Sequence, residues 1–329
     1  MPRSRVFLAT TLIPSARAIV ESACEVVAYE GGGRISREEL EEALQDVDGV
    51  LTSNQVRFDN DLLDACSRLR VISNNGVGYD NVDIPYATSR QVLVCNTPGV
   101  LTDAVADLTY GFIIDLTRGI TRSDRYVRER RWGKEPAMPL GMDLRGKTLG
   151  VLGLGRIGTA VAQRAPAFGL NVVYYDPIRN HSAEDRGLAQ YRERDAVLRE
   201  SDVVSVHVFL DPTTHRHISE REFSLMKPNA FLVNTSRGLV INQPDLVAAL
   251  QSGQLAGAAL DVFELEPPDP SDALLDQPNV ILAPHIGSAT TETRQAMAEL
   301  AARNVVAAVT GGEPECMVNP EVRRMRASP

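Results

Sequence analysis

The chain has 329 residues, of which 43% are hydrophobic and 23% are charged, and its formal net charge is −9. This length predicts about two domains, and the ordinary composition excludes a disordered or collagen-like chain. The acidic balance and the lack of a long basic run argue against nucleic acid or an anionic membrane as a partner.

The cysteines and apolar runs set further limits. None of the four cysteines lies in a CxxC pair, so no metal site is expected, and the absence of a disulfide framework indicates a cytoplasmic protein. The apolar run that follows Arg5 soon meets Pro14, which favours a first core strand over a signal peptide. No apolar run is long enough to predict a membrane span.

Short apolar runs alternate with helical patterns from the start of the chain. Residues 14–23 predict a helix with proline near its start, and Ser36 lies three residues before Glu39, as in a capping box. This alternation is typical of βα units around a parallel sheet. The strands expected in this first region are residues 5–10, 25–29, 49–52, 70–75 and 92–96.

A second α/β region follows a long helical pattern. Residues 103–132 predict one helix, apolar in its first half and charged in its second. Beyond it lie six strand candidates, the number expected for a complete dinucleotide-binding sheet. They are residues 148–153, 171–176, 203–208, 230–235, 257–262 and 279–284.

The last helical pattern begins at Thr291 and has no sheet of its own to cover. We therefore expect it to return to the first domain. The predicted fold is α/β, with two Rossmann-like domains and parallel sheets. Residues 101–287 would form an NAD-binding domain, inserted into a substrate-binding domain made of residues 1–100 and 288–329.

The strongest local motif is a glycine-rich turn between a strand and a helix. Gly153 permits the tight turn, Gly155 lets the backbone approach a pyrophosphate, and Gly158 lets the helix pack on the strand. The free N–H groups at the start of the helix favour phosphate binding. This pattern predicts a dinucleotide site, for which an ordinary structural turn is the alternative.

The next strand candidate ends in Asp176, which can accept hydrogen bonds from the ribose hydroxyls. Its charge would repel a 2′-phosphate, so NAD is favoured over NADP. Arg179 lies nearby and would soften that preference.

Three further strand candidates lead to charged or titratable residues. Arg237 can bind a carboxylate with two hydrogen bonds, and a surface salt bridge is its alternative. Asp261 and Glu266 lie in an acidic loop that is either solvated or paired with a histidine. His285 follows the last strand candidate. In a parallel sheet these strand ends share one edge with the glycine-rich turn, which favours a joint site.

With these motifs the chain resembles the NAD(P)-dependent D-2-hydroxyacid dehydrogenases over nearly its whole length. Within that family it is most similar to the glyoxylate/hydroxypyruvate reductases. The segments that carry the resemblance are NNGVGYDNVD (74–83), NTPGVLTDAVADL (96–108), GKTLGVLGLGRIG (146–158), VNTSRGLVIN (233–242), ALDVFELEP (259–267) and LAPHIGSAT (282–290).

The resemblance implies a role for each matching residue. Arg237 would bind the substrate carboxylate, His285 would be the general acid/base, and Glu266 would pair with His285 and favour its imidazolium form. The backbone of Val77 and Gly78 would hold the substrate carboxylate from the other domain. Cofactor contacts are implied for Thr102, Gly153, Gly155, Arg156, Ile157, Gly158, Asp176, His207, Pro212, Thr235, Asp261 and His285.

The predicted activity is hydride transfer between NAD(H) and a small 2-keto or D-2-hydroxy acid, with NADP as a secondary cofactor. The resemblance also implies a homodimer, with the region after Asp103 near its interface. D-3-phosphoglycerate and phosphite stay open as substrates on the same fold, whereas Glu266 argues against formate. A non-enzymatic NAD-sensing module, similar to a corepressor, is the remaining alternative.

Overall fold

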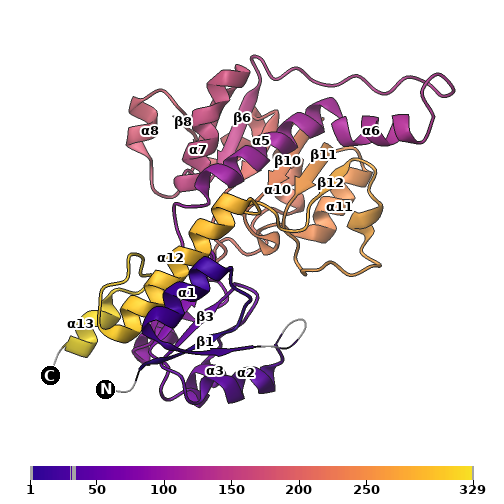
Figure 1. Cartoon of the computed structure of the whole chain (residues 1–329). Coiled ribbons are helices and arrows are strands. Elements are labelled where there is room, and N and C mark those ends of the chain that lie inside the picture. The colour runs from indigo at the N-terminus through magenta and orange to yellow at the C-terminus, as the bar shows by residue number, and fades with distance from the viewer. Residues whose placement is uncertain (1–2, 30, 32–34, 328–329) are drawn as a thin grey trace. The chain divides into compact units, whose positions relative to one another are not determined.

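The computed structural model describes residues 3–29, 31 and 35–327 (Figure 1). The chain forms two compact units. Unit 1 comprises Met1–Leu101 and Thr290–Pro329, and unit 2 comprises Thr102–Ala289. Each unit has one parallel sheet with a hydrophobic core on both faces, which confirms the predicted fold class.

The sheet of unit 1 has five parallel strands in the order β2-β1-β3-β4-β5. All five were expected, because strands that are covered on both faces are almost continuously apolar in sequence. They are β1 (Arg5–Leu8), β2 (Glu25–Ala28), β3 (Gly49–Thr52), β4 (Val71–Asn74) and β5 (Leu93–Cys95).

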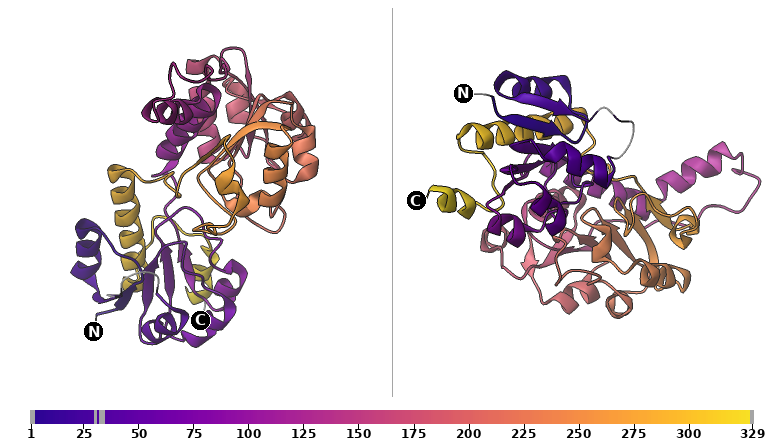
Figure 2. Two further views of the ribbon diagram at one scale, coloured as in Figure 1. Left: turned by 90° about the vertical axis from the view of Figure 1, so that its right-hand side faces the viewer. Right: turned by 90° about the horizontal axis from the view of Figure 1, so that it is seen from below.

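Helices cover both faces of this sheet. One core cluster packs α1 and α12 against it, and another packs α2, α3 and α4 against the opposite face. Figures 1 and 2 show α12, from the end of the chain, beside α1. The helices of unit 1 are α1 (Pro14–Ala23), α2 (Arg37–Leu44), α3 (Asn60–Ala65), α4 (Ile84–Ser89), α12 (Thr291–Thr310) and α13 (Glu321–Ala327).

The start of α2 confirms the predicted capping box. The backbone N–H of Glu39 donates to Ser36 Oγ at 3.2 Å, and the Ser36 N–H donates to the Glu39 carboxylate at 2.8 Å. Two N–H groups at the helix start are thereby satisfied.

The sheet of unit 2 has seven parallel strands in the order β12-β11-β10-β9-β6-β7-β8. Six of them match the expected runs, and β8 is an additional two-residue strand at the edge. They are β6 (Thr148–Leu152), β7 (Asn171–Tyr175), β8 (Gln190–Tyr191), β9 (Val203–Val206), β10 (Ala230–Asn234), β11 (Leu255–Leu260) and β12 (Val280–Leu282).

Helices also cover both faces of the second sheet, and α5 packs against α7 and against β10, β11 and β12. The α-helices of unit 2 are α5 (Thr102–Arg118), α6 (Ile120–Arg128), α7 (Arg156–Arg164), α8 (His181–Asp185), α9 (Arg194–Glu200), α10 (Glu220–Leu225) and α11 (Gln243–Gln251). Single 3₁₀ turns are η1 (Ala165–Phe168), η2 (Gly238–Val240) and η3 (Ala273–Asp276).

The prediction of one helix over residues 103–132 was wrong. Gly119 adopts a left-handed conformation, with φ 63° and ψ 41°, and separates α5 from α6. A left-handed glycine is a common way to end a helix. The Asp115 carboxylate then accepts from the N–H of Thr121 at 2.8 Å and satisfies a donor at the start of α6.

Candidate functional site

The glycine-rich turn after β6 has the shape that a dinucleotide requires. Gly153 has a positive φ of 91°, and a Cβ there would meet the carbonyl oxygen of His207 at 2.7 Å. A Cβ on Gly158 would come within 2.1 Å of the Gly153 carbonyl oxygen. At Gly155, in contrast, a Cβ would meet nothing within 4 Å. The outer two glycines are thus required for packing, while the middle one borders open space.

That open space lies at the start of α7, whose first two residues are Arg156 and Ile157. Helix N-termini present free N–H groups and a partial positive charge to phosphates. The residues present therefore fit a bound dinucleotide. Thr102, another predicted contact, is the first residue of α5 in the same unit.

Asp176 follows β7, and its carboxylate closes the turn beside the glycines. It accepts from the N–H of Leu154 at 2.9 Å and from the N–H of Ile178 at 3.0 Å. Arg179 is ion-paired with Glu184 and stacks on Tyr191, with 4.7 Å from its guanidinium carbon to the ring centroid. Asp176 is thus the charged group that contacts the turn, while Arg179 is engaged elsewhere.

His207 lies just beyond β9. Burial lowers its pKa to about 4, so its ring is neutral at physiological pH. Nε2 lies 2.8 Å from Ser205 Oγ, and Nδ1 is buried without a hydrogen-bond partner among the described residues. A neutral ring with one unused nitrogen suits packing or a single hydrogen bond to a ligand. Pro212 lies in the exposed turn that follows.

Arg237 stands in a turn that begins where β10 ends. Asn234 is fully buried, and both the oxygen and the nitrogen of its carboxamide form hydrogen bonds with the backbone of this turn. Its Oδ1 accepts from the N–H of Ser236 at 3.0 Å, and its Nδ2 donates to the Arg237 carbonyl at 2.9 Å. Thr235 Oγ1 lies 3.2 Å from Thr109 Oγ1. The half-buried Arg237 therefore projects from a backbone that is held from beneath.

Gly238 joins this turn to the acidic loop after β11. A Cβ at Gly238 would lie 1.9 Å from the carbonyl carbon of Phe263, so only glycine allows the two backbones to approach. The N–H of Phe263 donates to Glu266 Oε1 at 3.2 Å. This close packing brings Glu266 toward Arg237.

His285 and Glu266 form the central contact of the site, with Nδ1 and Oε2 2.8 Å apart. Burial alone would raise the pKa of Glu266. The hydrogen bond and the charge of His285, with a smaller contribution from Arg237, lower it overall, so Glu266 is ionised beside the ring. Because Nδ1 is engaged, Nε2 is the ring nitrogen left for a substrate.

Asp261 has a structural task that the sequence did not reveal. Its carboxylate is 1% exposed and accepts from the N–H groups of Ile286 and Gly287, each at 2.7 Å. Its carbonyl accepts from the N–H of His285 at 2.9 Å. His285 has a positive φ of 55°, which is unfavourable for a residue with a side chain. Asp261 therefore stabilises the turn that presents the imidazole.

Val77 and Gly78 lie in unit 1, in the loop that follows β4. The structure thus brings Arg237, Glu266 and His285 together at the carboxyl edge of one sheet. The two predicted carboxylate-binding residues lie just beyond a carboxyl strand end of the other sheet. Asn234, Gly238 and the turn-forming role of Asp261 were missed. Of these features, only Gly238 could have been suspected from the sequence, because a glycine directly after Arg237 suggests a close backbone approach.

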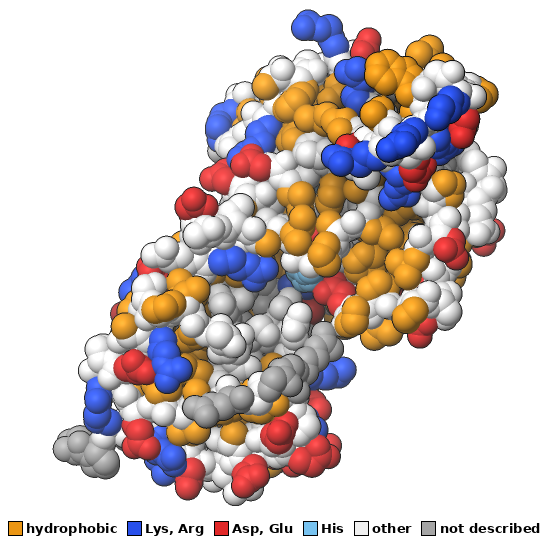
Figure 3. Space-filling view, turned by 45° about the vertical axis from the view of Figure 1, so that its right-hand side comes forward, with side chains coloured by type: hydrophobic (Ala, Val, Ile, Leu, Met, Phe, Trp, Pro, Cys, Tyr) orange, Lys and Arg blue, Asp and Glu red, His pale blue; other side chains and the backbone are white. Residues whose placement is uncertain are grey.

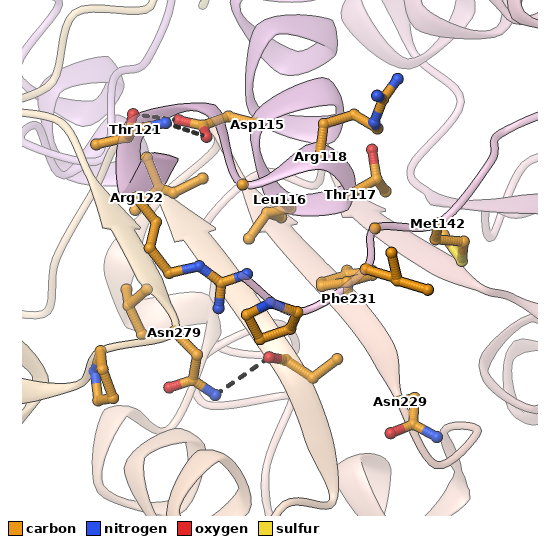
Figure 4. A pocket seen from close by; sticks show the side chains of 18 of the residues that line it. Asp115, Leu116, Thr117, Arg118, Thr121, Arg122, Met142, Asn229, Phe231 and Asn279 are labelled. Atoms are coloured by element: carbon orange, nitrogen blue, oxygen red, sulfur yellow. Dashed lines mark hydrogen bonds between the residues drawn. The ribbon is translucent and has the colours of Figure 1, made fainter. Parts of the chain in front are cut away.

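A cavity of about 510 Å³ lies at the opposite, amino edge of the unit 2 sheet (Figure 4). Its floor includes Leu116 and Phe231. Arg118, Arg122 and Arg125 also line it, and none of them forms an ion pair within the described part of the chain. Figure 4 shows Arg122 extending across the cavity between Leu116 and Asn279. This cavity lies at the amino ends of the strands, whereas His285 lies beyond their carboxyl ends. The cavity is therefore distant from the expected catalytic site.

Within residues 3–29, 31 and 35–327, no group of three or more His, Cys, Asp or Glu side chains could hold a metal ion. No helix within the same residues combines the length and the apolar character needed to cross a membrane.

Comparison with known proteins places these features in context. Residues 110–287 match the family model of the D-isomer specific 2-hydroxyacid dehydrogenase NAD binding domain. The glyoxylate reductase of Thermofilum pendens is 43% identical over 99% of this chain and 97% of its own.

Solved structures show the same likeness. A glyoxylate reductase from Paecilomyes thermophila superposes with a TM-score of 0.89 at 34% identity, covering 98% of this chain and 99% of that one. The NADPH-dependent glyoxylate/hydroxypyruvate reductase of Sinorhizobium meliloti, in complex with NADP and malonate, gives 0.85 at 34% identity, covering 96% and 97%.

Proposed function

Because this chain belongs to the D-isomer specific 2-hydroxyacid dehydrogenase family, we propose that it reduces a small 2-keto acid, glyoxylate or hydroxypyruvate, with NADH. The observation that carries the proposal is the 2.8 Å contact between His285 and an ionised Glu266, close to Arg237. The relatives named glyoxylate reductase support the choice of substrate, since they match nearly the whole chain.

The side chains divide the reaction between them. Bound nicotinamide supplies the hydride that C2 of the keto acid accepts. Arg237 orients the substrate and stabilises the negative charge that develops on the keto oxygen. His285 delivers the proton to that oxygen from Nε2, because its Nδ1 is held by the Glu266 carboxylate. Val77 and Gly78 bind the substrate carboxylate through their backbone.

We assign NAD binding to unit 2 and substrate binding to unit 1. The predicted cofactor residues Thr102, Arg156, Ile157, His207, Pro212, Thr235 and Asp261 all belong to unit 2. Asp176 favours NADH because its carboxylate suits ribose hydroxyls and repels a 2′-phosphate. NADPH remains a secondary cofactor, as the NADPH-dependent Sinorhizobium relative indicates. The buried free thiols of Cys24, Cys66 and Cys95 support a cytoplasmic location.

The proposal is tested by following oxidation of NADH and of NADPH with glyoxylate, hydroxypyruvate, pyruvate and 3-phosphohydroxypyruvate. We expect the highest kcat/KM with NADH and one of the first two acids. Preference for the phosphorylated acid would reassign the substrate. A preference for NADPH would remove the role of Asp176, and no turnover at all would favour an NAD-sensing module.

We further propose a homodimer built on the amino-edge cavity and on α6 with the segment after it. Figures 1 and 2 show this segment extending away from the unit 2 sheet. Its apolar side chains are open to solvent: Val127 is 51% exposed, Trp132 78% and Leu140 100%. Figure 3 shows hydrophobic side chains gathered on unit 2 beside Lys and Arg side chains. Such a surface on a soluble chain is typical of an interface, and a second copy would bring apolar groups to cover the cavity floor.

Sedimentation of the full chain tests this assembly. The wild type should sediment as a dimer and Leu140→Asp as a monomer, because a charge at the centre of an interface is unpaired. Ile178→Asp is the matched control, since Ile178 is 81% exposed and lies outside the cavity lining. A monomeric wild type would refute the proposal.

A further inference from the structure

The loop of Gly76, Val77 and Gly78 in unit 1 has an unusual pattern of hydrogen bonds. Each of its three carbonyl oxygens is occupied from within the unit. Gly76 O accepts from the N–H of Thr97 at 2.9 Å. Val77 O accepts from Asn96 Nδ2 at 2.8 Å, and Gly78 O accepts from Asn74 Nδ2 at 3.2 Å.

The three N–H groups of the same loop, in contrast to the carbonyl oxygens, have no hydrogen-bond partner among the described residues. A Cβ added to Gly76 would meet nothing within 4 Å, so this part of the loop borders open space. Consecutive backbone N–H groups without partners form a nest that attracts an anion.

The carboxamides that hold the carbonyls are themselves buried and fixed. Asn74 is fully buried at the end of β4, and Asn96 is 8% exposed just after β5. Asn74 Nδ2 also donates to Asn81 Oδ1 at 2.8 Å, and Asn81 Nδ2 donates to the Val56 carbonyl at 2.8 Å. The Asn96 backbone carbonyl accepts from Asn304 Nδ2 at 3.2 Å. The carboxamide of Asn74 is thus held by Asn81, and the backbone of Asn96 is held by Asn304.

We propose that Asn74 and Asn96 are positioning residues for the substrate carboxylate. By drawing the Val77 and Gly78 carbonyls inward, they leave only N–H donors facing the carboxylate. An outward carbonyl would repel that anion. This inference rests on the proposed 2-keto acid activity, and it assigns part of the substrate affinity to two neutral side chains that do not touch the substrate.

Replacing Asn96 by aspartate tests the idea with almost no change of shape. Asn96→Asp places an acceptor against the Val77 carbonyl, so the carbonyl loses its donor and is released. We expect the dissociation constant of oxalate, measured by calorimetry on the enzyme saturated with NADH, to rise roughly tenfold, the effect of losing about one hydrogen bond. The KM for the keto acid should rise in parallel, while the KM for NADH stays within twofold.

Asn319→Ala is the matched control. Asn319 is a fully buried asparagine of the same unit that accepts from the N–H of Val94 and donates to the Val92 carbonyl, away from the loop. Asn319→Ala should lower the melting temperature without weakening the binding of oxalate. If Asn96→Asp does not fold, Asn96→Ser and Asn74→Ser provide the same comparison with shorter side chains.

The outcomes separate this inference from the proposed function. Unchanged oxalate binding in folded Asn96 and Asn74 variants would overturn the positioning role and leave the reductase intact. An enzyme without turnover on any 2-keto acid would refute the reductase, yet weaker oxalate binding in the variants would still support the nest. Equal weakening by Asn319→Ala would show a general loss of structure and would also overturn the inference.

Discussion

Two turns of this molecule stand at carboxyl strand ends and are held in opposite ways. In unit 1, the buried carboxamides of Asn74 and Asn96 bind the carbonyls of Gly78 and Val77 and leave the N–H groups of the loop unused. In unit 2, the buried carboxylate of Asp261 binds the N–H groups of residues 286 and 287.

The difference shows how a buried polar side chain decides what a turn offers. A donor beneath the turn leaves backbone donors for an anion and needs no charge. An acceptor beneath the turn uses up those donors, so the turn offers a side chain, here the imidazole of His285. The first turn is suited to binding and the second to proton transfer.

The largest effect is expected where the second turn loses its side chain. His285→Ala removes the proton donor but leaves Asp261 with its backbone partners. We expect kcat for glyoxylate reduction to fall about 10²- to 10⁴-fold, the usual contribution of general acid catalysis. NADH binding, followed by its fluorescence, should stay within twofold of wild type. An unchanged kcat would remove His285 from the mechanism.

Arg237→Lys should have the next largest effect. Lysine keeps the positive charge but loses the planar pair of donors that fits a carboxylate. We expect kcat/KM for the keto acid to fall about 100-fold, close to the loss of one oxyanion donor. Arg216→Lys is the control, since Arg216 pairs with Glu264 and lies outside the proposed catalytic set. Similar losses in both variants would contradict a specific role for Arg237.

Much of this arrangement could be predicted from sequence because buried parallel strands are nearly continuous apolar runs. The strand ends then locate Arg237, Glu266 and His285 on one edge. The strand β8 at the sheet edge consists only of Gln190 and Tyr191, which is too short to give an apolar run in the sequence. Helical periodicity likewise continues across Gly119 although the backbone there is left-handed.

The hydrogen bonds that shape the two turns could not be predicted in the same way. Asp261 reaches the N–H groups of residues 286 and 287 only because β11 and β12 are neighbours in register. Asn96 meets Val77 only because β4 and β5 pair. An asparagine or aspartate at a strand end is compatible with many partners, and the tertiary fold selects one.

Glu266→Gln tests the charge beside the imidazole. The pKa of Glu266 is lowered, so its ionised form contributes stability above the ordinary glutamate range, and that stability is lost as the pH falls through the lowered pKa. At neutral pH Nδ1 of His285 therefore faces a carboxylate and not a neutral carboxyl group. Glutamine keeps the hydrogen bond to Nδ1 without the charge. We expect kcat to fall about tenfold, because a hydrogen bond to a charged partner is replaced by a weaker one to a neutral amide.

A kcat of Glu266→Gln equal to that of the wild type would show that the charge of Glu266 has no catalytic effect. Glu264→Gln is the control, because Glu264 lies in the same loop and pairs with Arg216 instead. Its kcat should match that of the wild type.

The smallest expected effect concerns the support beneath the second turn. Asp261→Asn keeps the shape of the side chain but turns one of its two acceptors into a donor that faces an N–H group. Leaving a buried N–H unpaired costs about 1–3 kcal/mol, so the melting temperature should fall by several degrees. Because His285 then loses support for its left-handed backbone, kcat should also fall about threefold.

Asp202→Asn separates support of the catalytic turn from general stability. Asp202 accepts from the N–H of Thr148 at 2.8 Å and pairs with Lys227, at the amino edge of the same sheet. It should lower the melting temperature to a similar degree while kcat stays at the wild-type level. If both variants lose stability and only Asp261→Asn loses kcat, the carboxylate acts through the position of His285. An equal kcat in the two variants would mean that the turn keeps its shape without the Asp261 carboxylate. The buried acceptor would then not be the reason that this turn presents the imidazole of His285.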